Sequence, residues 1–322
     1  MTLRRSIWFA TFLSLALCGV GLLAQQPAKK KNPKTQETPA EETKDDGLIV
    51  SMNTTQVVLN VTVTDINEKF ISGLKAENFK IFEDHAAQKI VSFGVEETPF
   101  TAAILLDMSG SMIPKMSLAK AACSRFASGI RTGDTIAIYG FKGHKVKQLQ
   151  DFTEVKDVDP LVWDTDADGN TPLYDAVVTA AQALALRPEQ RRAILVISDG
   201  ADTSSKASFD QALRAANVSN STIYTVDFSD SALGIGINRD TGMQVIREFA
   251  TKTGGRFFTT PGGGKLRDAF ESTVEELRHQ YTIVYEPTND KRDGKWRSIE
   301  VGINQPQHKV RTRSGYYGAK TE

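Results

Sequence analysis

The sequence predicts an α/β protein in which a doubly wound, mostly parallel sheet is inserted into a small β-sandwich-like domain. Three observations lead to this prediction. The middle of the chain alternates apolar strands with helical segments, which implies a mostly parallel sheet covered by helices on both faces. Short strands with a two-residue apolar period stand before and after this middle part. Each terminal set is too small to form a core alone, so we expect the two sets to fold together.

The first 24 residues are expected to be an export signal. They begin with Arg4 and Arg5, continue as an apolar stretch over 7–24 and give way to polar sequence. Cleavage after Ala24 would place the mature protein in the periplasm or outside the cell. The apolar stretch, about 18 residues, is also long enough to remain as an uncleaved membrane anchor. Residues 25–47 are rich in Lys, Pro, Glu and Thr and have no apolar periodicity, which predicts a disordered linker.

The predicted β domain has two parts, residues 48–97 and residues 281–318. Both parts contain short runs in which apolar and polar residues alternate between turn residues, as in half-buried strands. The expected strands are 57–63, 79–82, 90–93, 281–285, 296–303 and 310–313, with a polar stretch at 83–89 separating the second from the third.

The predicted α/β domain takes residues 98–280. Its elements in order are a strand at 101–106, a helix from about 114 to 130, a hairpin of 134–141 with 145–149, a helix from about 172, a strand at 193–198, a helix near 208–216, a strand at 222–228, a helix near 243–252, a strand at 256–260 and a last helix through about 280. Pro114 and Pro172 suit helix starts, because the first helical N–H has no intrahelical partner. Cys123 in the first helix is expected to be a small buried side chain rather than a reactive thiol.

Oxygen-bearing side chains follow two of these strands. Asp107, Ser109 and Ser111 come directly after the strand at 101–106, Asp199 follows the strand at 193–198, and Thr171 precedes a helix. Ligands of parallel sheets bind beyond the carboxyl ends of the strands, so we expect these side chains to meet there. Oxygen ligands without His or Cys nearby suit a hard cation such as Mg²⁺, Mn²⁺ or Ca²⁺ and suit zinc poorly.

This ordered set, D-x-S-G-S from Asp107, a lone Thr171 before a helix and Ser-Asp-Gly around Asp199, resembles the metal-ion-dependent adhesion site of von Willebrand factor type A domains. The resemblance covers roughly residues 98–280. It implies that the hydroxyls of Ser109, Ser111 and Thr171 coordinate the metal directly, while Asp107 and Asp199 act through bound water. It also implies an open coordination position that an acidic side chain of a partner fills.

The flanking segments carry a second resemblance. Residues 61–65, 74–79, 82–84 and 311–317 are similar to a group of bacterial exported proteins described as acidobacterial VWFA-related. The biochemical role of that group is poorly established, so this resemblance supports the domain assignment and adds little about function.

Two further patterns resemble known functional sites. Residues 164–175 resemble an EF-hand calcium loop, but Asp175 stands where Glu is usual and Thr171 stands where an apolar residue is usual. A solvated acidic loop is therefore the preferred interpretation of this stretch. Ser117 and Lys120 have the S-x-x-K spacing of penicillin-binding enzymes, and we interpret that spacing as a coincidence within a helix.

The function implied by the resemblance is that of an exported, non-catalytic protein-binding or adhesion module. Its cofactor would be a divalent cation, Mg²⁺ before Mn²⁺ or Ca²⁺, and its partner a protein that supplies an acidic residue. The 39 basic and 39 acidic residues balance, which argues against nucleic-acid binding, and the only membrane link would be an uncleaved N-terminal anchor. Two alternatives remain open: a regulatory or scaffolding subunit of an envelope enzyme complex, and a serine hydrolase in which Ser117 and Lys120 form a nucleophile pair, without an oxyanion-hole motif beside them.

Overall fold

The computed structural model describes residues 56–94, 98–158, 167, 169–200, 202–228, 237–259 and 264–320. The predicted export signal at 1–24 and the predicted linker at 25–47 lie outside the described residues. Contacts between Cα atoms group residues Ile49–Glu322 into one compact unit. Within the described part of the chain, no helix is both long enough and apolar enough to cross a membrane.

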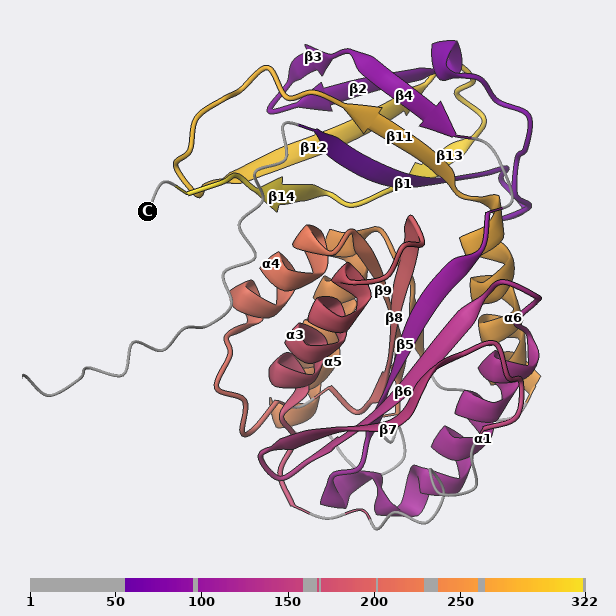
Figure 1. The fold of residues 1–322 in the computed structure, drawn as a ribbon, viewed down its shortest axis with the longest axis vertical. Helices are drawn as coiled ribbons and strands as arrows, with labels where there is room; N and C mark the ends of the chain where they lie inside the picture. Colours follow the sequence, from indigo (N-terminus) through magenta and orange to yellow (C-terminus); the bar gives the residue numbers. More distant parts are fainter. Residues whose placement is uncertain are drawn as a thin grey trace, which may run out of the picture. The chain divides into compact units, whose positions relative to one another are not determined.

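The middle of the chain forms the predicted mostly parallel sheet (Figure 1). The six strands lie in the order β10-β9-β8-β5-β6-β7. Every neighbouring pair is parallel except β6 with β7, which form an antiparallel hairpin at one edge. The strands are β5 (Phe100–Asp107), β6 (Thr135–Lys142), β7 (Lys145–Thr153), β8 (Arg191–Ser198), β9 (Ser221–Asp227) and β10 (Phe257–Thr259).

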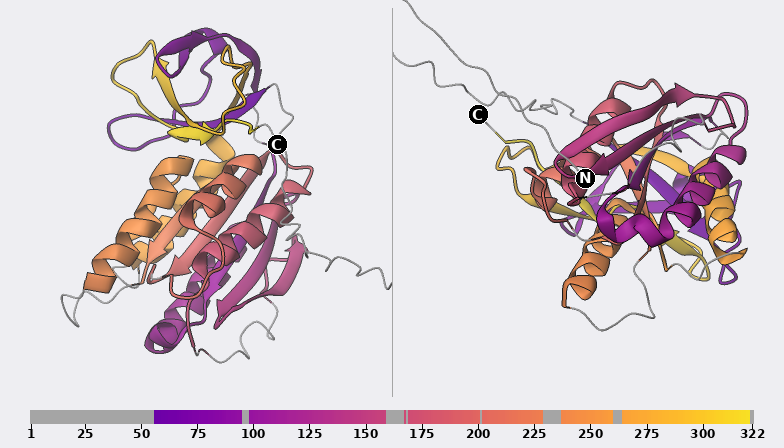
Figure 2. Two further views of the ribbon diagram at one scale, coloured as in Figure 1. Left: turned by 90° about the vertical axis from the view of Figure 1, so that its left-hand side faces the viewer. Right: turned by 90° about the horizontal axis from the view of Figure 1, so that it is seen from below.

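Helices cover both faces of this sheet, as the prediction requires (Figures 1 and 2). Ala102, Ile104 and Leu106 of β5 pack with α1 and α6, whereas Ala103 and Leu105 pack with α3, α4 and α5. Successive side chains of a strand point to opposite faces, so the continuous apolar run of β5 serves two cores at once. The helices are α1 (Met116–Ser128), α3 (Leu173–Ala185), α4 (Phe209–Val218), α5 (Ile237–Thr253) and α6 (Gly264–His279).

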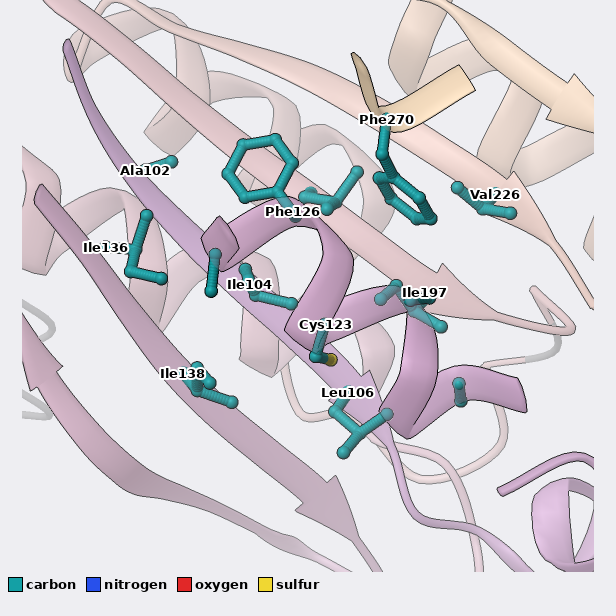
Figure 3. Packing of buried hydrophobic residues seen from close by; sticks show 14 of the residues in the cluster. Ala102, Ile104, Leu106, Cys123, Phe126, Ile136, Ile138, Ile197, Val226 and Phe270 are labelled. Atoms are coloured by element: carbon teal, nitrogen blue, oxygen red, sulfur yellow. The ribbon is translucent and has the colours of Figure 1, made fainter. Parts of the chain in front are cut away.

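Cys123 lies in the core between the sheet and α1, as expected (Figure 3). It is fully buried among residues such as Leu106 and Phe126 and forms no disulfide within the part of the chain that the structure describes. Burial raises the pKa of the Cys123 thiol to about 12, because the thiolate would lose its solvation there. The side chain therefore packs as a small hydrophobe and carries no reactive thiolate at neutral pH.

Strands from both ends of the described chain pair with one another in two four-stranded sheets. One sheet has the order β13-β1-β11-β4 and the other the order β14-β12-β2-β3, and their apolar side chains share a single core. The strands are β1 (Val57–Thr64), β2 (Phe79–Glu83), β3 (Ala86–Gln88), β4 (Ile90–Gly94), β11 (Tyr281–Tyr285), β12 (Trp296–Ile303), β13 (Lys309–Arg311) and β14 (Gly315–Tyr317). This agrees with the predicted fold class, while the exact domain boundaries at 97 and 280 stay a prediction.

Several local elements differ from the sequence prediction; β14, for example, was not expected, and β7 extends to Thr153. The helix expected from about residue 114 begins at Met116, because Gly110–Lys115 form a 3-10 helix first. The helix expected near 243–252 begins earlier, at Ile237. The polar stretch at 83–89 contains β3, a three-residue edge strand that pairs with β2 through its backbone and so does not need apolar side chains.

The carboxyl end of α6 is fixed by buried polar contacts. Arg278 of α6 forms an ion pair with Asp134 at 2.6 Å, and both side chains are almost fully buried. The Asp134 carboxylate also accepts the backbone N–H groups of Phe100 at 3.2 Å and Arg131 at 2.9 Å. The start of β5, the turn before β6 and the end of α6 are therefore joined at one carboxylate.

Candidate functional site

The candidate site lies where the strand order of the sheet changes direction. The chain leaves β5 toward β6 on one side and leaves β8 toward β9 on the other side. β5 and β8 are parallel neighbours, with Leu106 opposite Ile197, so their carboxyl ends lie side by side. This switch point is the position at which open α/β sheets bind ligands.

Asp107 is the last residue of β5 and is fully buried. Its Oδ2 atom accepts a hydrogen bond from the Ser198 hydroxyl at 2.6 Å, and its Oδ1 atom accepts the backbone N–H of Ser109 at 2.8 Å. Burial raises the pKa of the Asp107 carboxyl from 3.8 to about 6; the hydrogen bonds from Ser198 and Ser109 oppose this rise, and the charge of Asp199 adds to it. A cation bound beside Asp107 would favour the ionised form of its carboxyl.

Ser109 and Ser111 bring two hydroxyls together next to Asp107. Ser109 is buried and Ser111 is exposed, at the start of the 3-10 helix Gly110–Lys115. Their Oγ atoms are 3.1 Å apart. One hydroxyl is therefore buried and the other is exposed, and the two are close enough to contact a single ion.

The Thr171 loop lies against the Ser109 loop. The backbone N–H of Gly110 donates to the carbonyl of Gly169 at 3.2 Å. Thr171 is buried, and its backbone forms two hydrogen bonds with Thr203: its N–H donates to Thr203 Oγ1 at 2.8 Å, and its carbonyl accepts the Thr203 N–H at 2.9 Å. The loop that carries the Thr171 hydroxyl is thus hydrogen-bonded both to the loop after β5 and to the loop after β8.

Asp199 follows β8 directly and is half-buried. Its Oδ1 atom is buried and has no hydrogen-bond partner among the residues that the structure describes. A buried carboxylate oxygen without a partner is costly, and a cation or a cation-bound water would satisfy it. This oxygen, together with the hydroxyls around Asp107, fits the donor chemistry of a hard divalent ion.

The donor set depends on hydroxyls rather than on clustered charges. Among the residues that the structure describes, no three His, Cys, Asp or Glu side chains are grouped so that they could hold a metal. The oxygen groups that this edge of the sheet offers a cation include the hydroxyls of Ser109, Ser111 and Thr171. Such a neutral set is compatible with Mg²⁺, which keeps several waters and takes few carboxylates.

Sequence reasoning missed several residues that position this site. Ser198 holds Asp107, and its Oγ atom also accepts the Gly200 N–H at 3.0 Å. Asp202 accepts the Ser205 hydroxyl at 2.6 Å and the Tyr174 N–H at 3.2 Å, which fastens the loop after β8 to the first turn of α3. The strand order, which places Ser198 beside Asp107, is the signal that was lacking.

The structure describes parts of both alternative sites. The carboxylate of Asp175 accepts the backbone N–H groups of Lys206 at 3.0 Å and Ala207 at 2.8 Å, so it already has partners other than a calcium ion. Residues 164–166 and Asp168 of that loop lie outside the described residues. Ser117 and Lys120 lie on α1, and the Ser117 side chain is exposed.

Comparison with known proteins identifies the central part of the chain. Residues 102–201 match the family model of the von Willebrand factor type A domain. None of the curated proteins compared with the sequence matches it significantly.

Several solved structures are similar in fold. A conserved hypothetical protein, BatB from Bacteroides thetaiotaomicron, is 16% identical, with 55% of this chain and 98% of that chain covered and a TM-score of 0.45. The vWF domain of the type V pili tip protein Mfa5 from Porphyromonas gingivalis is 15% identical, with 55% and 94% covered and a TM-score of 0.44. The ArnB paralog VWA2 from Sulfolobus acidocaldarius is 14% identical, with 83% and 77% covered and a TM-score of 0.42. At these identities the likeness concerns the fold alone.

Proposed function

Residues 102–201 are a von Willebrand factor type A domain, and from this premise we propose that the chain is a non-catalytic protein-binding module that engages its partner through a divalent cation. The observation that carries the proposal is the convergence of oxygen atoms at the switch point of the sheet. The paired hydroxyls of Ser109 and Ser111 adjoin Asp107, and the buried Oδ1 atom of Asp199 has no hydrogen-bond partner within the described part of the chain.

The proposed roles follow from the charge and burial of these groups. Ser109, Ser111 and Thr171 hold the cation through neutral oxygens, which leave its charge largely uncompensated. Asp107 and Asp199 hold its waters and orient the hydroxyls. When bound, the cation supplies a positive centre with an exchangeable coordination position, and a carboxylate of the partner takes that position. Mg²⁺ is the first choice, and Mn²⁺ or Ca²⁺ also fit an oxygen-only set.

The test uses Asp107→Asn, which keeps the size of the buried side chain and removes its charge. Calorimetry with Mg²⁺ and Mn²⁺ should show loss of cation binding in this variant. The variant should also fail to capture a partner from an envelope extract, and the unaltered protein should fail to do so when EDTA is present. Glu77→Gln, at an exposed carboxylate in the short 3-10 helix before β2, is the matched control and should behave as the unaltered protein. Unchanged cation affinity in Asp107→Asn would refute the site, and capture that persists in EDTA would refute the mechanism.

We also propose that the protein is exported and that its mature form begins at Gln25. The support is the basic start and the apolar stretch of residues 1–24. Mass spectrometry of the protein recovered from cells should detect Gln25 as the N-terminal residue. Intact residues 1–24 on membrane-bound protein would support the anchor instead.

A further inference from the structure

The β6–β7 hairpin meets the loops of the candidate site at its tip. A two-residue turn, Gly143 and His144, joins the strands, and Gly143 has φ +61°, as glycine permits in such turns. The Gly143 N–H donates to the carbonyl of Asn170 at 2.7 Å, and the Gly143 carbonyl accepts the Ser204 hydroxyl. The hairpin tip is therefore hydrogen-bonded both to the Thr171 loop and to the loop after β8.

The backbones of these loops lie within van der Waals range of one another. A Cβ atom on Gly169 would lie 3.4 Å from the Gly143 Cα atom, and one on Gly110 would lie 3.9 Å from the Gly169 carbonyl oxygen, which are ordinary contact distances. Gly169 has φ +71°, a backbone conformation that favours glycine. The Ser109 loop, the Thr171 loop and the hairpin tip are thus joined through their backbones. The backbone N–H of Met108, the residue after Asp107, also donates to the carbonyl of Phe141 in β6 at 3.0 Å.

The hairpin carries basic side chains on its outer surface. His144, Lys145 and Lys147 are exposed, and Lys142 ends β6 opposite Lys145. Lys145 and Lys147 are alternate residues of an edge strand, so their side chains share one face of β7. The hairpin tip, which precedes Lys145, is hydrogen-bonded to the loops of the candidate site, so a partner bound at a cation there would come close to the hairpin. Lysines on an edge strand also discourage strand pairing, but that role does not require them beside the site loops.

We propose that the β6–β7 hairpin is a second contact for the partner, and that the partner presents an acidic segment with two or more carboxylates. One carboxylate takes the open position on the cation, and another pairs with Lys145 and Lys147. This inference rests on the proposed cation-dependent function. The hairpin would let the protein distinguish an acidic segment from a single acidic side chain, because a single carboxylate would bind the cation and make no contact with the hairpin.

The test uses two synthetic peptides of equal length as probes. The first, acetyl-Gly-Gly-Asp-Gly-Gly-amide, has one carboxylate, and the second, acetyl-Asp-Gly-Asp-Gly-Asp-amide, has three. Binding is followed by NMR titration of the full-length protein with saturating Mg²⁺. The double variant Lys145→Ser/Lys147→Ser should weaken the three-carboxylate peptide by about threefold to tenfold, as expected for exposed ion pairs, and leave the one-carboxylate peptide within about twofold. The selective loss should shrink as salt is added.

The control variant is Lys80→Ser/Lys309→Ser, which removes two exposed lysines from β2 and β13 and should affect neither peptide. Equal binding of the three-carboxylate peptide by the hairpin variant and the unaltered protein would overturn the inference and leave the proposed function standing. Equal weakening of both peptides would also overturn it, since the lysines would then act through the site itself. If neither peptide binds the unaltered protein with Mg²⁺, the proposed function fails and this inference fails with it.

Discussion

Ser198→Ala should weaken cation binding although Ser198 is not a proposed ligand. The substitution removes the hydroxyl that donates to Asp107 at 2.6 Å and accepts the Gly200 N–H at 3.0 Å. A hydrogen bond to a charged group contributes about 1.5–3 kcal/mol to the free energy of unfolding. Loss of a group that orients a metal ligand lowers metal affinity by about 10-fold to 100-fold, which equals about 1.4–2.7 kcal/mol. The first value bears on the stability of the apo protein and the second on cation binding, so we expect the dissociation constant for Mg²⁺ to rise by about 10-fold to 100-fold.

Isothermal titration calorimetry with Mg²⁺ and Mn²⁺ measures the effect directly. Urea unfolding in EDTA reports separately how much the apo protein is destabilised, so a folding defect and a binding defect can be told apart. Ser221→Ala is the matched control, because Ser221 is also a buried serine, 2.8 Å from the Ser219 hydroxyl at the start of β9. The reasoning is refuted if Ser198→Ala binds Mg²⁺ as tightly as Ser221→Ala does.

Two further predictions concern the fold. Arg278→Met should destabilise the protein by about 3–5 kcal/mol in urea unfolding, because the Asp134 carboxylate is left buried without its cation. Arg125→Met breaks the exposed ion pair with Glu271 and should lower the free energy of unfolding by less than about 1 kcal/mol. Similar losses of stability in both variants would contradict the importance of the buried Arg278–Asp134 pair. Truncation after Gln280 removes β11 and β13, the two neighbours of β1. Amide hydrogen exchange should then become fast in β1 and stay slow in β8, and unchanged protection of β1 would show that it does not depend on the C-terminal strands.

Much of the fold follows from local patterns that a single sequence contains. The unbroken apolar run of β5 predicts a strand buried on both faces, and all of its residues are buried. The alternating residues of β1 predict a strand with one buried face, and Val57, Leu59, Val61 and Val63 belong to one core. Element boundaries were less accurate, because short 3-10 turns and edge strands such as β3 are stabilised by backbone contacts that side-chain periodicity does not report.

The site residues were predicted from their spacing and from the family resemblance. Neither of these could predict the groups that hold the site residues in position. The role of Ser198 depends on β8 lying beside β5, and the role of Gly143 depends on β6 lying on the other side of β5. Both facts are properties of strand order. The sequence contains each residue, but several orders of parallel strands are compatible with the same alternation of strands and helices.

Asp107 shows why the site and the core cannot be treated separately. The sequence places it in a turn beyond the sheet, where substitutions would affect binding and leave the fold intact. In the structure it is the last residue of β5 and fully buried, with hydrogen bonds to Ser198 and to the Ser109 backbone. Its replacement by alanine would therefore leave buried donors unsatisfied and act on folding as well as on binding. Ser111 is exposed in the same loop, so a substitution there changes a proposed ligand without disturbing the core, and the two positions together can separate cation binding from stability.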